Sequence, residues 1–190
     1  MVAHVAFADS GQPYCVPFLH VRVGGVLYLH GSTGSRAMRA LADGAPACVT
    51  VTILDGLVLA RSAFEHSANY RSAMLLGRFD PVAAEHRNAA LRAFTDRLVP
   101  GRWDEVRPPT AKELAKTSVL AMTIGEASVK VRTGPPSDGD GPDATDTVWA
   151  GVLPLSTRFD PPQPAPELPA GLAPPRSVRD AYSTGNEGGS

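Results

Sequence analysis

The chain has 190 residues, of which 43% are hydrophobic, and a formal net charge of -1 at pH 7. This length suits one domain with a real core, and a charge near zero argues against a general nucleic-acid-binding protein. No apolar run approaches the roughly 20 residues of a membrane-spanning helix, and the N-terminus lacks a signal-peptide pattern. We therefore expect a cytoplasmic protein that contacts neither nucleic acid nor membrane.

The first part of the chain is predicted to form strands joined by tight turns. Apolar segments predict strands over residues 2–8, 13–23 and 26–30, with turns at 9–12 and 24–25. Pro17 is expected at an edge, a bulge or a break, because proline cannot donate to a ladder. A helix over residues 35–42 follows and ends before Gly44, a plausible residue for the position after a helix. Cys15 and Cys48 lie in apolar segments and are expected to be buried free thiols, with a metal pair or a disulfide as the alternative. No metal site is predicted.

The middle and the end of the chain alternate strands with short helices. Residues 46–54 and 57–64 are predicted as two strands joined by a hairpin turn at Asp55-Gly56. A short helix over residues 110–116 carries the capping-box pattern of Thr110 and Glu113. The other predicted elements are a helix over residues 81–98 and strands over 69–79, 117–124, 128–133 and 147–155.

Two stretches fall outside this pattern. Residues 134–146 are rich in Gly, Pro and Asp and are predicted to form a flexible surface loop. Beyond Arg158 the chain is rich in Pro, Gly, Ser and Ala, so a domain over 1–157 and a disordered tail over 158–190 are predicted. Many short strands with hairpin signals and few helices favour a closed or nearly closed antiparallel barrel.

A hydroxyl- and glycine-rich turn, His30–Arg36, joins an apolar strand to a helix. Its spacing matches no phosphate loop, dinucleotide fingerprint or hydrolase elbow. Backbone N–H groups at a helix N-terminus nevertheless attract anions, and the hydroxyl of Ser35 and the guanidinium of Arg36 add further donors. The alternative is that Ser32 or Thr33 only caps the helix and that Arg36 is solvated.

Several segments together resemble the FMN-binding split-barrel superfamily, on its pyridoxamine 5′-phosphate oxidase-related and nitroimidazole-resistance side. The resemblance covers about residues 2–155 and rests on segments 11–17, 27–36, 55–62, 66–72, 129–134 and 149–154. It implies a mainly β fold, an antiparallel six- to eight-stranded split barrel with short flanking helices. It also implies a homodimer that binds flavin at the interface of its subunits.

The resemblance also implies a set of cofactor contacts. The turn would bind the flavin phosphate through Ser35 and Arg36, with Ser32 beside them and with His30 and Gly31 close to the ring or the ribityl chain. The remaining cofactor-binding candidates lie on other predicted strands and are Val49, Thr50, Arg61, Lys130 and Trp149. For Lys130 and Trp149 the alternatives are a solvated strand charge and a residue that seals the end of the barrel.

A second polar group supplies candidates for catalysis. Arg61, His66, Tyr70 and Arg71 provide two cations, a group that titrates near neutrality and a phenol around one strand turn. His66 and Tyr70 are catalytic candidates, together with His30. The alternative for His66 is a loop histidine in contact with water. Related nitroimidazole-resistance proteins carry a catalytic histidine, which maps to the neighbourhood of His30 more readily than to His66.

The function predicted from the sequence is an FMN-dependent oxidoreductase that acts on a small, unidentified substrate. The alternative is a non-catalytic protein that binds flavin, the deazaflavin F420 or haem on the same barrel, and a third possibility is a scaffold that has lost its cofactor. Relative to the family pattern the chain starts late. It also lacks the arginine- and histidine-containing C-terminal motif of true pyridoxamine phosphate oxidases, so oxidation of vitamin B6 is not expected.

Overall fold

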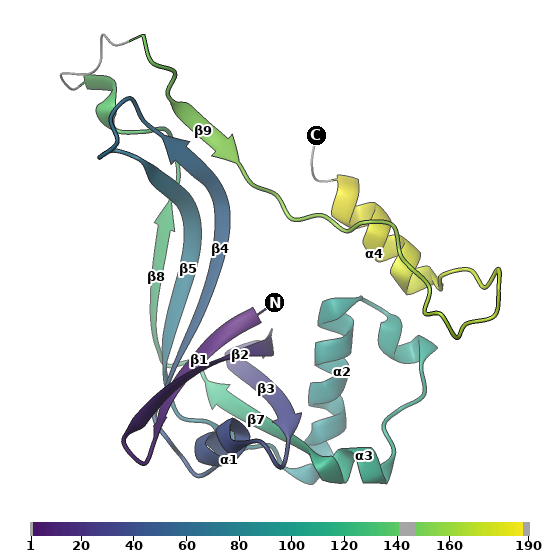
Figure 1. Ribbon diagram of the computed structural model, residues 1–190. Helices are drawn as coiled ribbons and strands as arrows, with labels where there is room; N and C mark the ends of the chain where they lie inside the picture. The colour runs from purple at the N-terminus through teal and green to yellow at the C-terminus, as the bar shows by residue number, and fades with distance from the viewer. Residues whose placement is uncertain (1, 141–146, 188–190) are drawn as a thin grey trace. The chain divides into compact units, whose positions relative to one another are not determined.

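The computed structural model describes residues 2–140 and 147–187 and divides the chain into two compact units (Figure 1). Unit 1 comprises Met1–Val49, Leu76–Glu126 and Arg158–Ser190, and unit 2 comprises Thr50–Leu75 and Ala127–Thr157. Parts of the predicted loop at 134–146 and of the predicted tail therefore lie outside the described residues.

The sheet of unit 1 has the strand order β6-β7-β3-β2-β1. Its strands are β1 (Val2–Asp9), β2 (Gln12–Val23), β3 (Val26–Ser32), β6 (Asp80–Pro81) and β7 (Thr117–Thr123). The β1–β2 turn follows the prediction, because Asp9 pairs with Gln12 and both turn residues, Ser10 and Gly11, have positive φ. Two consecutive positive φ angles match the right-handed twist of a hairpin. The hairpin at Gly24-Gly25 is also confirmed.

Pro17 lies where β2 has a partner on one side only. The pairing of β2 with β3 covers His20–Val23, whereas the pairing of β2 with β1 extends along the whole of β1. A proline is tolerated at such a half-paired position because its missing N–H removes no bond to a second neighbour. The expectation of an edge-like position is therefore confirmed.

In the sequence, helices lie between the strands of unit 1 and after them. They are α1 (Arg36–Ala42), η1 (Ala84–His86), α2 (Arg87–Leu98), η2 (Arg102–Glu105), α3 (Ala111–Lys116) and α4 (Arg176–Glu187). The helix predicted from Pro81 begins later, because Pro81 pairs with Leu120 of β7 as part of β6. No helix within residues 2–140 and 147–187 is long and apolar enough to cross a membrane.

The core of unit 1 follows from strand alternation. In β1 the side chains of Ala3, Val5 and Phe7 are buried, while Val2 and His4 are exposed and Ala6 is half-buried. Successive side chains of a strand point to opposite faces, so one face of β1 packs inward. The largest fully buried side chains elsewhere in this unit are Leu29, Met38, Leu41, Val49, Phe79, Val119, Leu120 and Met122. The expected burial of the two thiols is wrong, because Cys15 is exposed and Cys48 is half-buried.

Unit 2 contains most of β4 (Ala47–Leu59), β5 (Ser67–Gly77) and β8 (Glu126–Arg132) and all of β9 (Gly151–Pro154), with β9 paired to β4. The hairpin predicted at Asp55-Gly56 is wrong, because β4 runs through both residues without a turn. Gly56 pairs with Pro154, and a Cβ on Gly56 would lie 3.0 Å from the carbonyl oxygen of Leu153. The glycine thus allows β9 to approach β4 closely.

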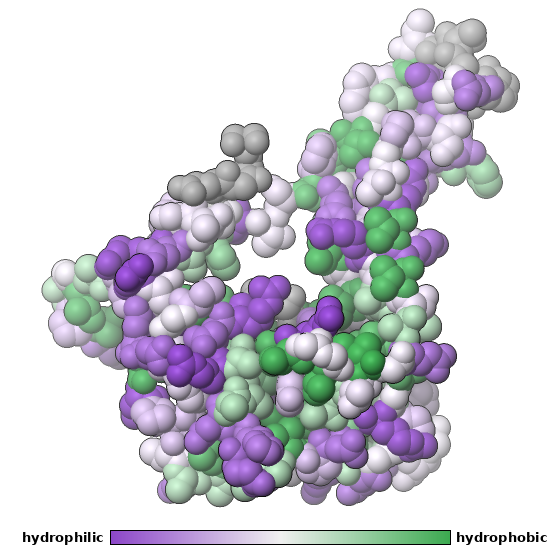
Figure 2. All heavy atoms as spheres, turned by 180° about the vertical axis from the view of Figure 1, so that it is seen from behind, coloured by the Kyte–Doolittle hydropathy of each residue, from purple (hydrophilic) through white to green (hydrophobic). Residues whose placement is uncertain are grey.

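Unit 2 leaves much apolar surface uncovered. Every residue of β8 except Arg132 is exposed, so Val129 and Val131 lie open on one face and Lys130 on the other. Figure 2 shows hydrophobic residues at the surface over these strands. Others in this unit are Ile53, Leu54, Leu57, Met74, Leu153 and Leu155.

The predicted tail contains the helix α4, Arg176–Glu187, in the structure. Ser177 at its start is buried, and both its backbone N–H and its hydroxyl donate to the carboxylate of Glu105, at 3.0 and 2.5 Å. These bonds lower the pKa of Glu105 and satisfy donors of the first helical turn. The domain boundary at residue 157 stays a prediction, whereas a mainly β, antiparallel architecture with few helices is confirmed.

Candidate functional site

The turn between β3 and α1 is held by its own hydrogen bonds. Ser32 accepts the N–H of Ser35 with its carbonyl at 3.0 Å and the N–H of Gly34 with its hydroxyl at 3.2 Å, while Thr33 donates to the carbonyl of Lys116. The cap of α1 is Ser35, whose hydroxyl accepts from the N–H of Met38, rather than Ser32 or Thr33. The hydroxyl proton of Ser35 remains available for donation.

Arg36 is oriented by an aromatic pair of the β1–β2 hairpin. Its Nη1 donates to the hydroxyl of Tyr14 at 2.8 Å, and its guanidinium lies 5.6 Å from the centre of the Tyr14 ring. Tyr14 in turn stacks on Phe7, with ring centres 5.5 Å apart. A guanidinium has five N–H donors, so the bond to Tyr14 leaves Arg36 able to bind an anion.

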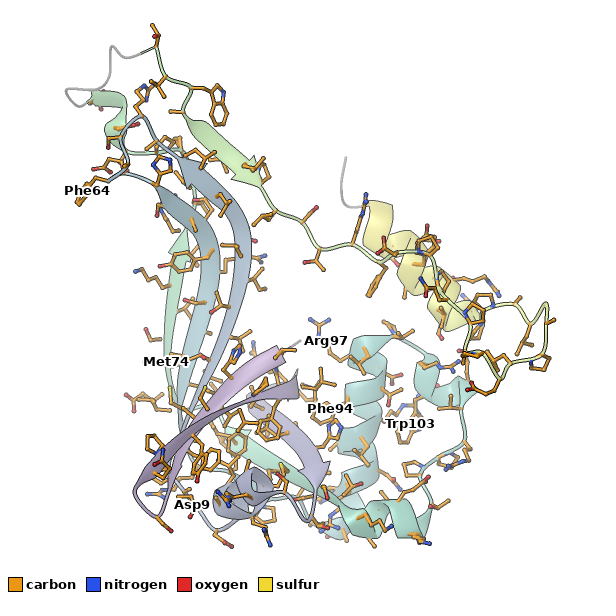
Figure 3. All side chains as sticks on the ribbon, in the orientation of Figure 1. Asp9, Phe64, Met74, Phe94, Arg97 and Trp103 are labelled. Carbon is orange, nitrogen blue, oxygen red and sulfur yellow. The ribbon has the colours of Figure 1, made fainter. Side chains whose placement is uncertain are left out.

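His30 lies half-buried on β3 and has no hydrogen-bond partner for Nδ1, which is buried. Its ring packs edge-on against Phe94 of α2, with ring centres 4.4 Å apart, and Figure 3 shows Phe94 on that helix. Burial lowers the pKa of His30, because a charged imidazole would lose its hydration. His30 is therefore a neutral base at pH 7.

The neighbouring candidates have clear packing roles. A Cβ on Gly31 would lie 2.9 Å from Cγ of Met38, so the glycine makes room for this buried side chain. Val49 is completely buried in unit 1, which makes its side chain a core residue. Thr50 follows it on β4 and is half-buried, in unit 2.

In unit 2, the guanidinium of Arg61 is bound to Asp138. The carboxylate of Asp138 accepts the backbone N–H of Arg61 at 2.5 Å and its Nη1 at 3.0 Å. Asp138 is buried, and these bonds, the backbone bond first, lower the pKa of its carboxyl group. Nothing in the sequence distinguishes Asp138 from the other aspartates of its loop.

A second polar contact in unit 2 also went unpredicted. Asn69 is buried on β5; its side chain donates to the carbonyl of Gly134 at 3.1 Å and accepts from Arg132 at 2.5 Å. Buried amides are costly unless hydrogen-bonded, so this contact fixes the start of the loop after β8. Together with Asp138, it ties that loop to the connection between β4 and β5.

The remaining candidates belong to unit 2 as well. His66 is exposed, and its Nδ1 lies 2.9 Å from the carbonyl oxygen of Ser62. Lys130 places its ammonium 5.8 Å from the centre of the Tyr70 ring, a cation–π contact. The Trp149 side chain is 67% exposed, and its ring covers Gly151, where a Cβ would meet it at 3.0 Å.

The structure thus brings the candidates together in two groups. The residues of the turn, from His30 to Arg36, lie in unit 1 with Val49, and those at 50, 61, 66, 70, 130 and 149 lie in unit 2. The first group offers hydroxyl and guanidinium donors beside a neutral imidazole. The second offers an exposed imidazole, a phenol, an ammonium and exposed aromatic rings.

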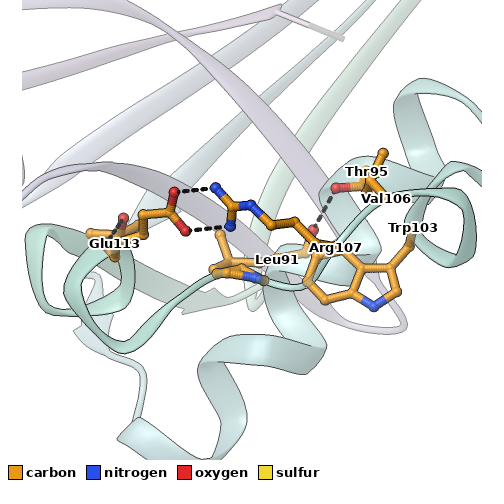
Figure 4. Close-up of a pocket in the computed structure, with 8 residues that line it drawn as sticks. Leu91, Thr95, Trp103, Val106, Arg107 and Glu113 are labelled. Carbon is orange, nitrogen blue, oxygen red and sulfur yellow. Dashed lines mark hydrogen bonds and ion pairs between the residues drawn. The ribbon is translucent and has the colours of Figure 1, made fainter.

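A separate pocket of about 480 Å³ lies in unit 1 beside α2 (Figure 4). Leu91, Trp103 and Val106 form its apolar lining. Arg107 binds Glu113 through two bonds of 2.9 and 2.7 Å, so its charged groups satisfy one another. Among residues 2–140 and 147–187, no group of three or more His, Cys, Asp and Glu is arranged to hold a metal ion.

Comparison with known proteins gives consistent matches. A family model described as pyridoxamine 5′-phosphate oxidase matches residues 1–131. The FAD and haem binding protein from Mycobacterium smegmatis is 48% identical, with a TM-score of 0.92 over 95% of this chain and 89% of that one. The flavocytochrome Anf3 from Azotobacter vinelandii is 42% identical, with a TM-score of 0.86 over 95% and 84%.

A more distant structure is alike in fold alone. It is a candidate 5-nitroimidazole antibiotic resistance protein from Bacteroides thetaiotaomicron, 19% identical, with a TM-score of 0.56 over 67% of this chain and 75% of that one. No curated protein matches the chain. The two structures above 40% identity therefore bear most strongly on function.

Proposed function

The chain belongs to the pyridoxamine 5′-phosphate oxidase family of split-barrel proteins, and on that premise we propose that it binds both a flavin and a haem. The observation that carries the proposal is the 48% identity, over 95% of the chain, to a protein that binds FAD and haem. The likeness to a flavocytochrome at 42% identity supports the same pair. A protein that binds both cofactors corresponds to the alternative raised by the sequence, extended from one cofactor to two.

For the flavin, we favour FAD over the FMN expected from the sequence, because the 48% identical protein binds FAD. The residues of unit 1 fit a flavin phosphate or pyrophosphate: Arg36 keeps free N–H groups, and Ser35 keeps a hydroxyl proton. Charge-assisted hydrogen bonds of this type contribute about 1.5–3 kcal/mol each. The half-buried, neutral imidazole of His30 lies in the strand that leads into this turn.

For the haem, unit 2 offers what a porphyrin needs. A porphyrin is a large apolar plate, and Phe64 and Trp149 are 91% and 67% exposed. Figure 3 shows Phe64 pointing outward at the end of unit 2. The iron takes an imidazole in many haem proteins, and His66 supplies one in the same unit. These residues fit the group.

The flavin would accept a hydride or an electron pair, and the haem would exchange single electrons. In this proposal the chain itself binds the two groups, orients them and limits the access of water. The oxidoreductase activity on a small substrate stays a prediction. We also propose a homodimer, supported by the exposed apolar side chains of β8 and its neighbours.

The test is the absorbance spectrum of the full chain, purified and then titrated separately with FAD, FMN and haemin. We expect a flavin band and a Soret band, with tighter binding of FAD than of FMN. Mass spectrometry of the molecules released on denaturation identifies any cofactor carried through purification. Absence of both bands after reconstitution overturns the proposal, and a flavin band alone overturns its haem part.

A further inference from the structure

The chain contains five histidines, any of which could offer an imidazole to the haem iron. A ligating nitrogen must carry a free lone pair and be accessible, and the other ring nitrogen is usually fixed by a hydrogen bond to a carbonyl or a carboxylate. The position and the hydrogen bonds of each ring therefore distinguish the candidates.

His66 meets these requirements. Its Nδ1 lies 2.9 Å from the carbonyl oxygen of Ser62, and a carbonyl only accepts hydrogen bonds. Nδ1 must then carry the proton, so in the neutral ring the lone pair lies on Nε2. Because His66 is exposed, this nitrogen can be reached from outside the unit.

The segment that accepts the hydrogen bond of His66 is itself bound to a buried carboxylate. Ser62, which accepts the bond from Nδ1, directly follows Arg61, and the backbone N–H and guanidinium of Arg61 are both bound to the buried Asp138. The carbonyl that sets the tautomer is thus tied to the loop after β8. A fixed acceptor of this kind orients an imidazole and raises its basicity as a ligand.

The other histidines are less suitable. His30 has its Nδ1 buried without a partner, and its ring packs against Phe94. His20 is half-buried and has a contact of its own. His4 and His86 are exposed, but in the described part of the chain no hydrogen bond fixes either ring.

Two exposed aromatic side chains belong to the same end of unit 2 as His66. Phe64, two residues away, is 91% exposed. Trp149 precedes Gly151, which pairs with Leu59 at the end of β4, so Trp149 lies at the same end of unit 2 as the connection that carries His66. Exposed aromatic rings at the same end of a unit as an oriented imidazole are suited to cover a porphyrin face.

We propose that His66 is the axial ligand of the haem iron, through Nε2, an inference that rests on the haem binding proposed above. Coordination would form a bond from the Nε2 lone pair to the iron. The imidazole would either displace a water molecule from the iron or occupy a vacant coordination position. No electron is transferred in this step. Asp138 acts as a positioning residue, through Arg61 and Ser62.

The test compares His66→Ala with the matched control His86→Ala, which removes another exposed imidazole. We expect His66→Ala to weaken haemin binding by at least about 100-fold, more than the loss of an outer hydrogen-bond partner costs, and to change the Soret band. The control should behave like the wild type. FAD affinity should be unchanged in both variants, which also shows that they are folded.

A second variant, His66→Gly, provides a direct readout of ligation. Added imidazole should restore the wild-type Soret band and the iron–imidazole vibration in the resonance Raman spectrum of the reduced protein. If His66→Ala binds haemin with the wild-type affinity and spectrum, His66 is not the ligand, whereas haem binding itself stands. If the wild-type chain binds no haemin, the proposed function fails in its haem part and the ligand assignment fails with it.

Discussion

The carboxylate of Asp138 holds Arg61 at two points, the backbone N–H at 2.5 Å and the guanidinium at 3.0 Å, across 77 residues of chain. Replacing Asp138 with Asn removes the charge that compensates Arg61 while it keeps the size of the side chain. The carboxylate is buried and the guanidinium is half-buried, so leaving Arg61 unpaired is destabilising.

We therefore expect Asp138→Asn to lower the melting temperature by several degrees, measured by differential scanning calorimetry. Asp140→Asn is the control, because it makes the same change at an exposed position nearby. Equal melting temperatures for the two variants would show that the pair does not stabilise the fold. If Asp138 positions His66 through Arg61 and Ser62 as proposed, Asp138→Asn also weakens haemin binding.

Ser35 can be tested for its two roles separately. Ser35→Ala removes the helix cap, which costs about 1 kcal/mol, and removes the hydroxyl donor. Ser35→Asp keeps a strong cap but places a negative charge where the flavin phosphate is predicted. We expect Ser35→Asp to fold as stably as the wild type and to bind FAD at least about tenfold more weakly, the effect of roughly 1.4 kcal/mol. Unchanged FAD affinity in the Asp variant would contradict a phosphate site at this turn.

His30 should make the stability of unit 1 depend on pH. Folding lowers the pKa of His30 from 6.5, so the unfolded chain binds the proton more readily. The stability that depends on the neutral ring is fully present above pH 6.5 and is lost as the pH falls through the lower pKa of the folded state. The free energy of unfolding of His30→Leu, measured with urea, should therefore depend less steeply on pH below pH 6.5 than that of the wild type. An identical pH profile in the variant and the wild type rules this explanation out.

The carboxylate of Glu113 should act over a more acidic range. Arg107 and Thr110 lower its pKa from 4.5 to about 2 through hydrogen bonds. Its contribution to stability is present above pH 4.5 and disappears as the pH falls toward about 2. We expect Glu113→Gln to be less stable than the wild type at pH 6. Its stability, followed by circular dichroism, should also fall less steeply than that of the wild type as the pH is lowered from 4.5 toward about 2. Glu85→Gln, at an exposed carboxylate, should follow the wild-type curve.

Local chemistry made parts of the fold predictable. The turn at Ser10-Gly11 and the cap of α3 by Thr110 and Glu113 depend on residues within a few positions of one another, and both are confirmed. Gly56 failed as a turn signal, because the strand that requires the glycine lies almost a hundred residues further along the chain. A local pattern cannot distinguish a glycine that bends the chain from one that admits a neighbour.

The candidate site shows the same division. Ser35 and Arg36 were selected as candidates because a strand, a turn and a helix follow one another there. The cap of that helix was expected at Ser32 or Thr33 and lies at Ser35. The partner of Arg61 is an aspartate in a stretch where Asp, Gly and Ser repeat, so its identity depended on the three-dimensional path of the loop. The burial of Nδ1 in His30 likewise depends on α2, whose Phe94 is far away in sequence.

The contact between Ser177 and Glu105 also affects what a protease would release from the chain. Residues 158–173 are exposed and carry no helix or strand, whereas α4 after them is anchored through Ser177. Cleavage in exposed, irregular backbone needs little local unfolding. Cleavage there would leave α4 as a separate peptide that stays bound to the rest of unit 1 through the carboxylate of Glu105. Glu105→Gln would weaken this binding.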